Sequence, residues 1–154
     1  MKNECIIDRD NIFYNVKEHD REEVIRLLGE HLYNNGYVKE TFSAAIAERE
    51  KRFPTGLRIG KYGIAIPHTD IKHVIKPAIC VAKLYRPVAF IQMGSEREEV
   101  QVELILMLAL RSPDKQIEVL KKIAVFLGEE EKTERLIAAQ SEDELFCRMA
   151  EIFK

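Results

Sequence analysis

The sequence predicts a layered α/β fold, on three observations. Short and nearly unbroken apolar runs occupy its middle, at residues 63–66, 78–82 and 102–110, as expected for strands buried on both faces of a sheet. Segments with apolar residues at helical spacing lie before and after these runs. No repeat, low-complexity tract or Pro/Gly/Ser-rich linker divides the 154 residues, so we expect a single domain over residues 1–154.

The first third of the chain predicts two helices. Asp20, followed three residues later by Glu23, resembles a capping box, and apolar residues then recur at helical spacing until the Asn-Asn-Gly at residues 34–36. A second helix is expected over residues 40–52, ended by the Phe-Pro-Thr-Gly at residues 53–56. Residues 12–16 are a further strand candidate.

The second half predicts more strands and then helices. Residues 88–90 are a weaker, edge-like strand candidate, and the run at 102–110 is either a buried strand or a buried helix. Helical periodicity returns over residues 117–127 and is closed by Gly128. Leu136 and Ile137 mark another helix, and Ser141 with Glu144 opens a final one.

Composition excludes several classes of function. The 24 basic and 26 acidic side chains give a net charge of −2, so no nucleic-acid partner is expected. Cys5, Cys80 and Cys147 are odd in number and widely spaced, which favours a reducing cytoplasm over a disulfide framework or a zinc knuckle. No apolar run reaches the length of a signal peptide or a membrane span, so we expect a cytoplasmic protein.

Among the four histidines, His68 has the setting of a functional residue. His31 lies in line with the apolar face of the first helix, where a structural role is expected, and His19 precedes that helix in an exposed position. His68 directly follows the buried strand at residues 62–66 and Pro67, which cannot continue a strand ladder. Ligands and catalytic groups collect at such strand ends in α/β sheets.

The segment His68-x-Asp70-x-x-His73 is compatible with more than one chemistry. The two imidazoles and the carboxylate suit zinc or iron, as in a metal-dependent hydrolase. A neutral imidazole is also a nucleophile near pH 7, oriented by a hydrogen bond from its other nitrogen to Thr69, Asp70, His73 or a nearby carbonyl. An exposed loop histidine without function is the third interpretation.

Two motifs extend this segment into a family resemblance. Residues 49–57 are Arg-Glu-x-x-Phe-Pro-Thr-Gly-Leu, and residues 62–70 are Tyr-Gly-Ile-Ala-Ile-Pro-His-Thr-Asp. With Pro87-Val88-x-Phe90, Met93-Gly94, the run at 104–110 and a helix beginning near Gln116, they resemble the enzyme IIA domains of the fructose/mannitol family of the bacterial sugar phosphotransferase system. The likeness covers nearly the whole chain and is strongest to the galactitol-type proteins.

This resemblance implies a fold and a function. The fold would be a three-layer sandwich, with a mixed sheet of about five strands and helices on both faces. His68 would accept a phosphoryl group from the phosphocarrier protein HPr and donate it to a cysteine of the cognate enzyme IIB, in galactitol-like sugar uptake. Neither a cofactor nor a resident metal is implied, and the membrane would be reached only indirectly, through the IIC transporter.

The resemblance also assigns site residues. Arg49 matches an arginine near the active site, where it would offset charge on the phosphoryl oxygens. Gln116 stands where mannitol-type members have a second histidine, and an amide cannot take up a proton. His73 either substitutes for that histidine or is structural, and we hypothesise that Asp70 orients a ring N–H of His68. A regulatory protein of the same fold, controlling a protein target by its phosphorylation state, is an alternative.

Overall fold

The structure is a computed structural model in which residues 6–153 are described. A five-stranded sheet forms its centre, in the order β1-β4-β5-β3-β2. The strands are β1 Ile12–Val16, β2 Gly56–Ile59, β3 Tyr62–Ala65, β4 Ala78–Ile91 and β5 Glu99–Ala109. The α-helices are α1 Arg21–Asn34, α2 Phe42–Arg52, α3 Pro113–Leu127, α4 Glu130–Ile137 and α5 Glu142–Ile152, and the 3₁₀ helices are η1 Arg9–Asn11 and η2 Ile71–His73.

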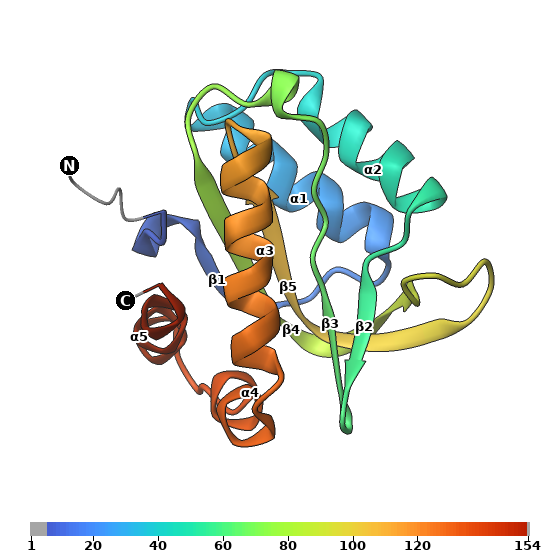
Figure 1. The fold of residues 1–154 in the computed structure, drawn as a ribbon, viewed down its shortest axis with the longest axis vertical. Helices are drawn as coiled ribbons and strands as arrows, with labels where there is room; N and C mark the ends of the chain where they lie inside the picture. The colour runs from blue at the N-terminus through green and yellow to red at the C-terminus, as the bar shows by residue number, and fades with distance from the viewer. Residues whose placement is uncertain (1–5, 154) are drawn as a thin grey trace.

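The sheet is mixed and covered by helices on both faces, which confirms the predicted α/β sandwich. β1 is parallel to β4 and β3 is parallel to β5, whereas β2 with β3 and β4 with β5 are antiparallel. One core cluster lies between the sheet and α1 with α2, and a second lies between the sheet and α3, α4 and α5 (Figure 1). The central strand β5 contributes to both clusters, and its residues 104–109 are all buried.

The predicted helix starts are confirmed by their caps. The side chain of Asp20 accepts a hydrogen bond from the backbone N–H of Glu23 at 2.9 Å, and that of Ser141 accepts one from Glu144 at 3.1 Å. Each cap satisfies one of the N–H groups that a helix leaves without an internal partner. The strand predicted over residues 12–16 is likewise present as β1.

One strand expectation is confirmed against its alternative, and two strand assignments differ from expectation. The run at 102–110, for which a helix was an alternative, is strand β5, because it pairs along its length with β4. Residues 88–90 are not a separate edge strand: they continue β4 beyond a register shift between Lys83 and Val88, and still pair with β5. Strand β2 was not expected at all, and its antiparallel pairing with β3 fixes the segment that follows α2.

Two of the three cysteines lie within the described residues. Cys80 and Cys147 are free thiols, and burial strongly raises the pKa of Cys80, whereas Cys147 is exposed. Cys5 lies outside the described residues. No helix within residues 6–153 has the length and apolar character needed to cross a membrane.

Candidate functional site

His68 lies three residues beyond the end of β3, on a segment held by both neighbouring strands of the sheet. The backbone N–H of Leu108 in β5 donates to the carbonyl of Pro67 at 3.0 Å. On the other side, the backbone N–H of Ile66 donates to the hydroxyl oxygen of Thr55, just before β2, at 3.2 Å. The backbone that carries the imidazole is therefore fixed although the ladder of β3 with β2 has ended at Ala65.

The ring of His68 is oriented by a backbone carbonyl. Nδ1 lies 2.8 Å from the carbonyl oxygen of Ile66. Because a carbonyl can only accept, Nδ1 carries the proton, and in the neutral ring the lone pair is on Nε2. The hypothesis that Asp70 orients the ring is wrong: its carboxylate instead accepts from the backbone N–H of Lys72 at 3.0 Å and caps η2.

The surroundings of His68 favour its neutral form. Partial burial lowers the pKa of His68 below its ordinary value, and the charge of Arg49 lowers it further. The hydrogen bond to Ile66 acts in the opposite direction and does not cancel these effects. A half-buried imidazole with a lowered pKa therefore presents an unprotonated nitrogen near neutral pH.

Arg49 reaches the site from the last turn of α2. Its guanidinium lies over the ring of Phe53, 5.1 Å from the centroid, and its Nε is buried with no hydrogen-bond partner in the described chain. The neighbouring cation Arg52 instead pairs with Glu48 at 3.3 Å. Arg49 thus brings a positive charge that acts on His68, and one of its buried donors has no partner in the described chain.

Gln116 is close to the site, whereas His73 bonds elsewhere. Gln116, in the first turn of α3, places its Nε2 3.5 Å from the carbonyl oxygen of Thr69, the residue after His68. Figure 1 shows this start of α3 and η2 at the same end of the molecule. The Nδ1 of His73 is hydrogen-bonded to the Thr41 hydroxyl at 2.7 Å, at the start of α2.

These contacts leave the metal interpretation without support. Nowhere in residues 6–153 do three His, Cys, Asp or Glu side chains form a group that could hold a metal ion. Asp70 and His73 each have another hydrogen-bond partner, as described above. The remaining histidines match expectation: His31 is bonded through Nε2 to the Asn11 side chain at 2.9 Å, and His19 is exposed.

Exposed apolar side chains border the site. Phe53 is 61% exposed and packs against Arg49, and Ile117, 53% exposed, follows Gln116. Met93, 50% exposed, is tied to the start of β2 by a hydrogen bond from its N–H to the carbonyl of Gly56 at 2.8 Å. Exposed aromatic and aliphatic side chains of this kind are typical of the core of protein–protein interfaces.

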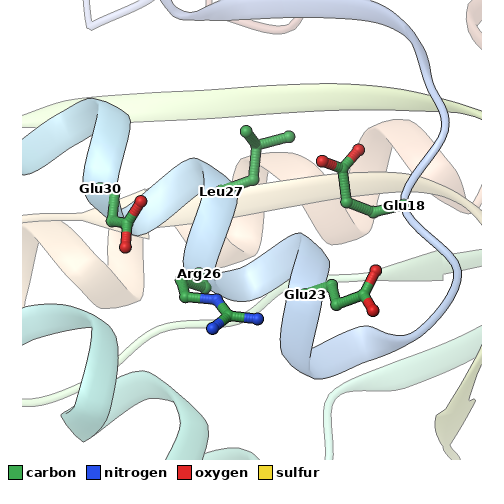
Figure 2. A pocket seen from close by; sticks show the side chains of 5 residues that line it. All are labelled: Glu18, Glu23, Arg26, Leu27 and Glu30. Carbon is green, nitrogen blue, oxygen red and sulfur yellow. The ribbon is translucent and has the colours of Figure 1, made fainter.

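A shallow hollow of about 230 Å³ lies elsewhere, along α1 and the segment before it. Figure 2 shows its lining: Glu18, Glu23, Arg26, Leu27 and Glu30. None of the predicted site residues lines it, and its three carboxylates would repel a phosphoryl group. The hollow is therefore not part of the His68 site.

Comparison with known proteins places the chain in a family. Residues 5–151 match the family model of the phosphoenolpyruvate-dependent sugar phosphotransferase system, EIIA 2. The chain belongs to this family. As an EIIA component, it is a phosphotransferase of the sugar phosphotransferase system. The predicted resemblance is thereby confirmed.

Individual relatives carry galactitol and mannitol names. The chain is 31% identical to the galactitol-specific EIIA component of Escherichia coli (strain K12) over 118 residues, 77% of this chain and 78% of the relative. It is 30% identical to the mannitol-specific enzyme IIA component of Bacillus subtilis (strain 168), over 96% of this chain and 98% of the relative. Among solved structures, the complex of mannitol enzyme IIA with phosphorylated mannitol enzyme IIB from Escherichia coli matches with a TM-score of 0.75 at 30% identity, covering 92% of this chain and 95% of that one.

The group that orients the His68 ring could not be identified from any side chain in the sequence. The acceptor of the His68 ring proton is a main-chain carbonyl, which every residue possesses, so its role follows only from the local path of the chain. The nearby carboxylate of Asp70 was the more conspicuous candidate. It is used instead by the local turn of η2.

Proposed function

We propose that this EIIA domain, comprising residues 1–154, is a phosphoryl relay that accepts its phosphoryl group on Nε2 of His68. The observation that carries the proposal is the hydrogen bond from Nδ1 to the Ile66 carbonyl, since it leaves Nε2 as the free nucleophilic nitrogen. The lowered pKa of His68 supports the same assignment, because the attacking ring must be neutral.

The transfer steps balance without a proton donor or acceptor. The Nε2 lone pair attacks the phosphorus carried by the donor, and the bond between that phosphorus and the donor breaks as the new N–P bond forms. The phosphorylated ring keeps its Nδ1 proton and becomes positively charged, with Ile66 still accepting. In the second step a thiolate attacks the phosphorus, and His68 leaves as a neutral imidazole. Gln116, which cannot exchange protons, is compatible with this sequence of steps.

Arg49 and Gln116 have supporting roles in this proposal. The guanidinium of Arg49, whose charge already acts on His68, would bind the phosphoryl oxygens, because their negative charge must be stabilised during transfer. Gln116 would hold the Thr69 carbonyl and with it the segment after His68. The bond between His73 and Thr41 supports the structural interpretation of His73 over a role as a substitute histidine.

For partners, we propose HPr as donor and a cysteine of the cognate enzyme IIB as acceptor. A similar EIIA structure is a complex with phosphorylated enzyme IIB, and the apolar border formed by Phe53, Met93 and Ile117 suits protein docking. The glutamine at position 116 and the galactitol-specific relative favour galactitol-like uptake. The relay would work in the cytoplasm and meet the membrane only through the IIC transporter.

Phosphorylation of purified protein tests the proposal. The chain is mixed with phosphoenolpyruvate, enzyme I and HPr, and its intact mass is measured. We expect one acid-labile phosphoryl group on the wild type and on His19→Ala, whose histidine is exposed and lies just before α1, and none on His68→Ala. A phosphoryl group on His68→Ala would overturn the proposal.

A further inference from the structure

The carboxylate of Glu50 is buried beneath the site and bonded twice to one residue. Glu50 is only 6% exposed. Its Oε2 accepts from the backbone N–H of Thr55 at 2.8 Å, and its Oε1 accepts from the Thr55 hydroxyl at 2.9 Å. Burial raises the pKa of Glu50, and the two Thr55 bonds and the charge of Arg21 act in the opposite direction. A buried carboxylate is costly, and it persists where hydrogen bonds compensate it.

The Glu50 carboxylate determines how the Thr55 hydroxyl bonds to Ile66. A hydroxyl has a single proton, and that of Thr55 is donated to Glu50. The lone pairs of the Thr55 oxygen are then available to the backbone N–H of Ile66, which donates to it at 3.2 Å. This side-chain bond comes directly after the last β2–β3 pair, Gly56 with Ala65, and replaces the strand ladder there.

The same peptide segment carries the acceptor for the His68 ring. The N–H of Ile66 is held by Thr55, and the carbonyl of Ile66 accepts from Nδ1 of His68 at 2.8 Å. Three successive hydrogen bonds therefore connect Glu50, Thr55, Ile66 and His68. Arg49, the residue before Glu50 on α2, acts on His68 by its charge.

We propose that Glu50, acting through Thr55, is a positioning residue that holds the Ile66 peptide so that His68 keeps its proton on Nδ1 and presents Nε2. This inference rests on the proposed function of His68. The last turn of α2 thus serves the site twice, with Arg49 acting through its charge and Glu50 acting through the hydrogen bonds of Thr55. A merely structural Glu50 would stabilise the turn between α2 and β2 without affecting the ring.

Two nearly isosteric variants disrupt this series of hydrogen bonds, one at Glu50 and the other at Thr55. Glu50→Gln replaces one acceptor oxygen by an NH₂ group, so that only one of the two Thr55 donors, the hydroxyl or the backbone N–H, keeps its acceptor. Thr55→Val removes the hydroxyl and leaves the Ile66 N–H without its acceptor. Thr55→Ser keeps the hydroxyl and is the rescue variant. Glu48→Gln is the matched control, because this carboxylate is on the same helix but exposed and paired with Arg52.

The readouts are the tautomer of His68, from imidazole ¹⁵N shifts, and the rate of phosphoryl transfer from phosphorylated HPr. In Glu50→Gln and Thr55→Val we expect a mixture of tautomers and a rate lower by about 10-fold to 100-fold, as for other groups that orient a reacting side chain. Thr55→Ser and Glu48→Gln should match the wild type in both. Folded Glu50→Gln and Thr55→Val proteins with wild-type tautomer and rate would overturn the inference.

If the variants do not fold, hydrogen exchange on the wild-type protein tests the same inference. Slow hydrogen exchange is expected at the amides of Thr55 and Ile66, and fast exchange at both would overturn the proposal. The tautomer readout also separates this inference from the proposed function. A wild type that takes up no phosphoryl group refutes the relay, whereas a phosphorylated His68 that is indifferent to Glu50→Gln refutes only the positioning role.

Discussion

The Ile66 carbonyl and the Arg49 guanidinium act on His68 in different ways. The carbonyl specifies which ring nitrogen is protonated, and it does so at a distance of 2.8 Å. The guanidinium lowers the pKa of the same ring through its charge and keeps a buried Nε without a partner in the described chain. At the scale of residues, one group therefore selects the nucleophilic atom while the other favours the state in which that atom can react.

Replacing Arg49 should change both the titration of His68 and its reactivity. In Arg49→Gln the pKa of His68 should rise, because one of the causes that lowers it is removed while the carbonyl of Ile66 remains. Transfer from phosphorylated HPr should slow by about 100-fold, the scale found when one donor to a developing anion is lost. A titration of the His68 imidazole by NMR and a transfer assay measure the two effects.

The matched control for Arg49 is its neighbour Arg52. This cation lies on the same turn of α2 but is exposed and paired with Glu48. Arg52→Gln should leave the His68 titration and the transfer rate at wild-type values. Equal effects of the two substitutions would mean that the helix end acts only through its overall charge, and the specific role of Arg49 would be refuted.

At the scale of elements, strand β3 carries His68, and its packing depends on Gly63. A Cβ atom at Gly63 would lie 2.0 Å from the backbone carbonyl oxygen of Gln101 in β5. Side chains can yield to such an approach, but a strand backbone held in a ladder cannot. The absence of a side chain at this position lets β3 lie close against β5, and so determines where the segment after β3 emerges.

Gly63→Ala should therefore impair both stability and transfer. We expect a loss of about 1–3 kcal/mol in the free energy of unfolding, as for other overpacked sites, with a slower transfer because β3 is displaced. Urea denaturation and the transfer assay measure these effects. Gly128→Ala is the control, because its nearest contacts would be at 3.4 Å and its φ is −67°. An unchanged unfolding free energy in Gly63→Ala would contradict the close packing of the two strands.

Local patterns predicted most elements of the fold. The helix after Asp20 and the one after Ser141 were found because their caps are encoded within three residues. The position of His68 at a strand end followed from the apolar run and from Pro67. These features depend only on residues that are close together in the sequence, so a single sequence is enough to predict them.

Features set by distant partners were missed. β2 has only four residues, and its strand character comes from pairing with β3. The continuation of β4 through residues 88–91 depends on β5, because no pattern within the segment reports the register shift after Lys83. The hydrogen bond from the Ile66 N–H to Thr55 likewise joins two segments, 11 residues apart, whose contact arises only from the fold.

At the scale of the whole molecule, the proposed relay must dock two proteins at one surface. Ile117 and Met93 come from α3 and from the segment after β4, and both are about half exposed near the site. Interfaces of this kind depend on a few apolar contacts, and truncating one of them weakens binding more than it alters chemistry.

Ile117→Ala and Met93→Ala should raise the KM for phosphorylated HPr by about 5-fold to 30-fold, the effect of 1–2 kcal/mol of lost contact energy, with little change in kcat. Steady-state transfer kinetics measure both parameters. Val125→Ala is the matched control on the same helix: its side chain is 73% exposed but eight residues beyond Ile117, which is about 12 Å along the axis. A similar rise in KM for Val125→Ala would place the docking surface elsewhere.

The carbonyl of Ile66, which accepts the ring proton, also affects the lifetime of the phosphorylated His68 imidazole. A carbonyl oxygen accepts a hydrogen bond but does not take the proton away, so in the proposed relay the phosphorylated imidazole remains a cation. When the N–P bond of this cation breaks, the imidazole leaves as a neutral group. Because a neutral imidazole is a good leaving group, nucleophiles break the N–P bond easily, and water is one of them. The phosphorylated domain is therefore expected to transfer its phosphoryl group readily and to have a short lifetime. It would keep the group only between its encounter with the donor and its encounter with the acceptor.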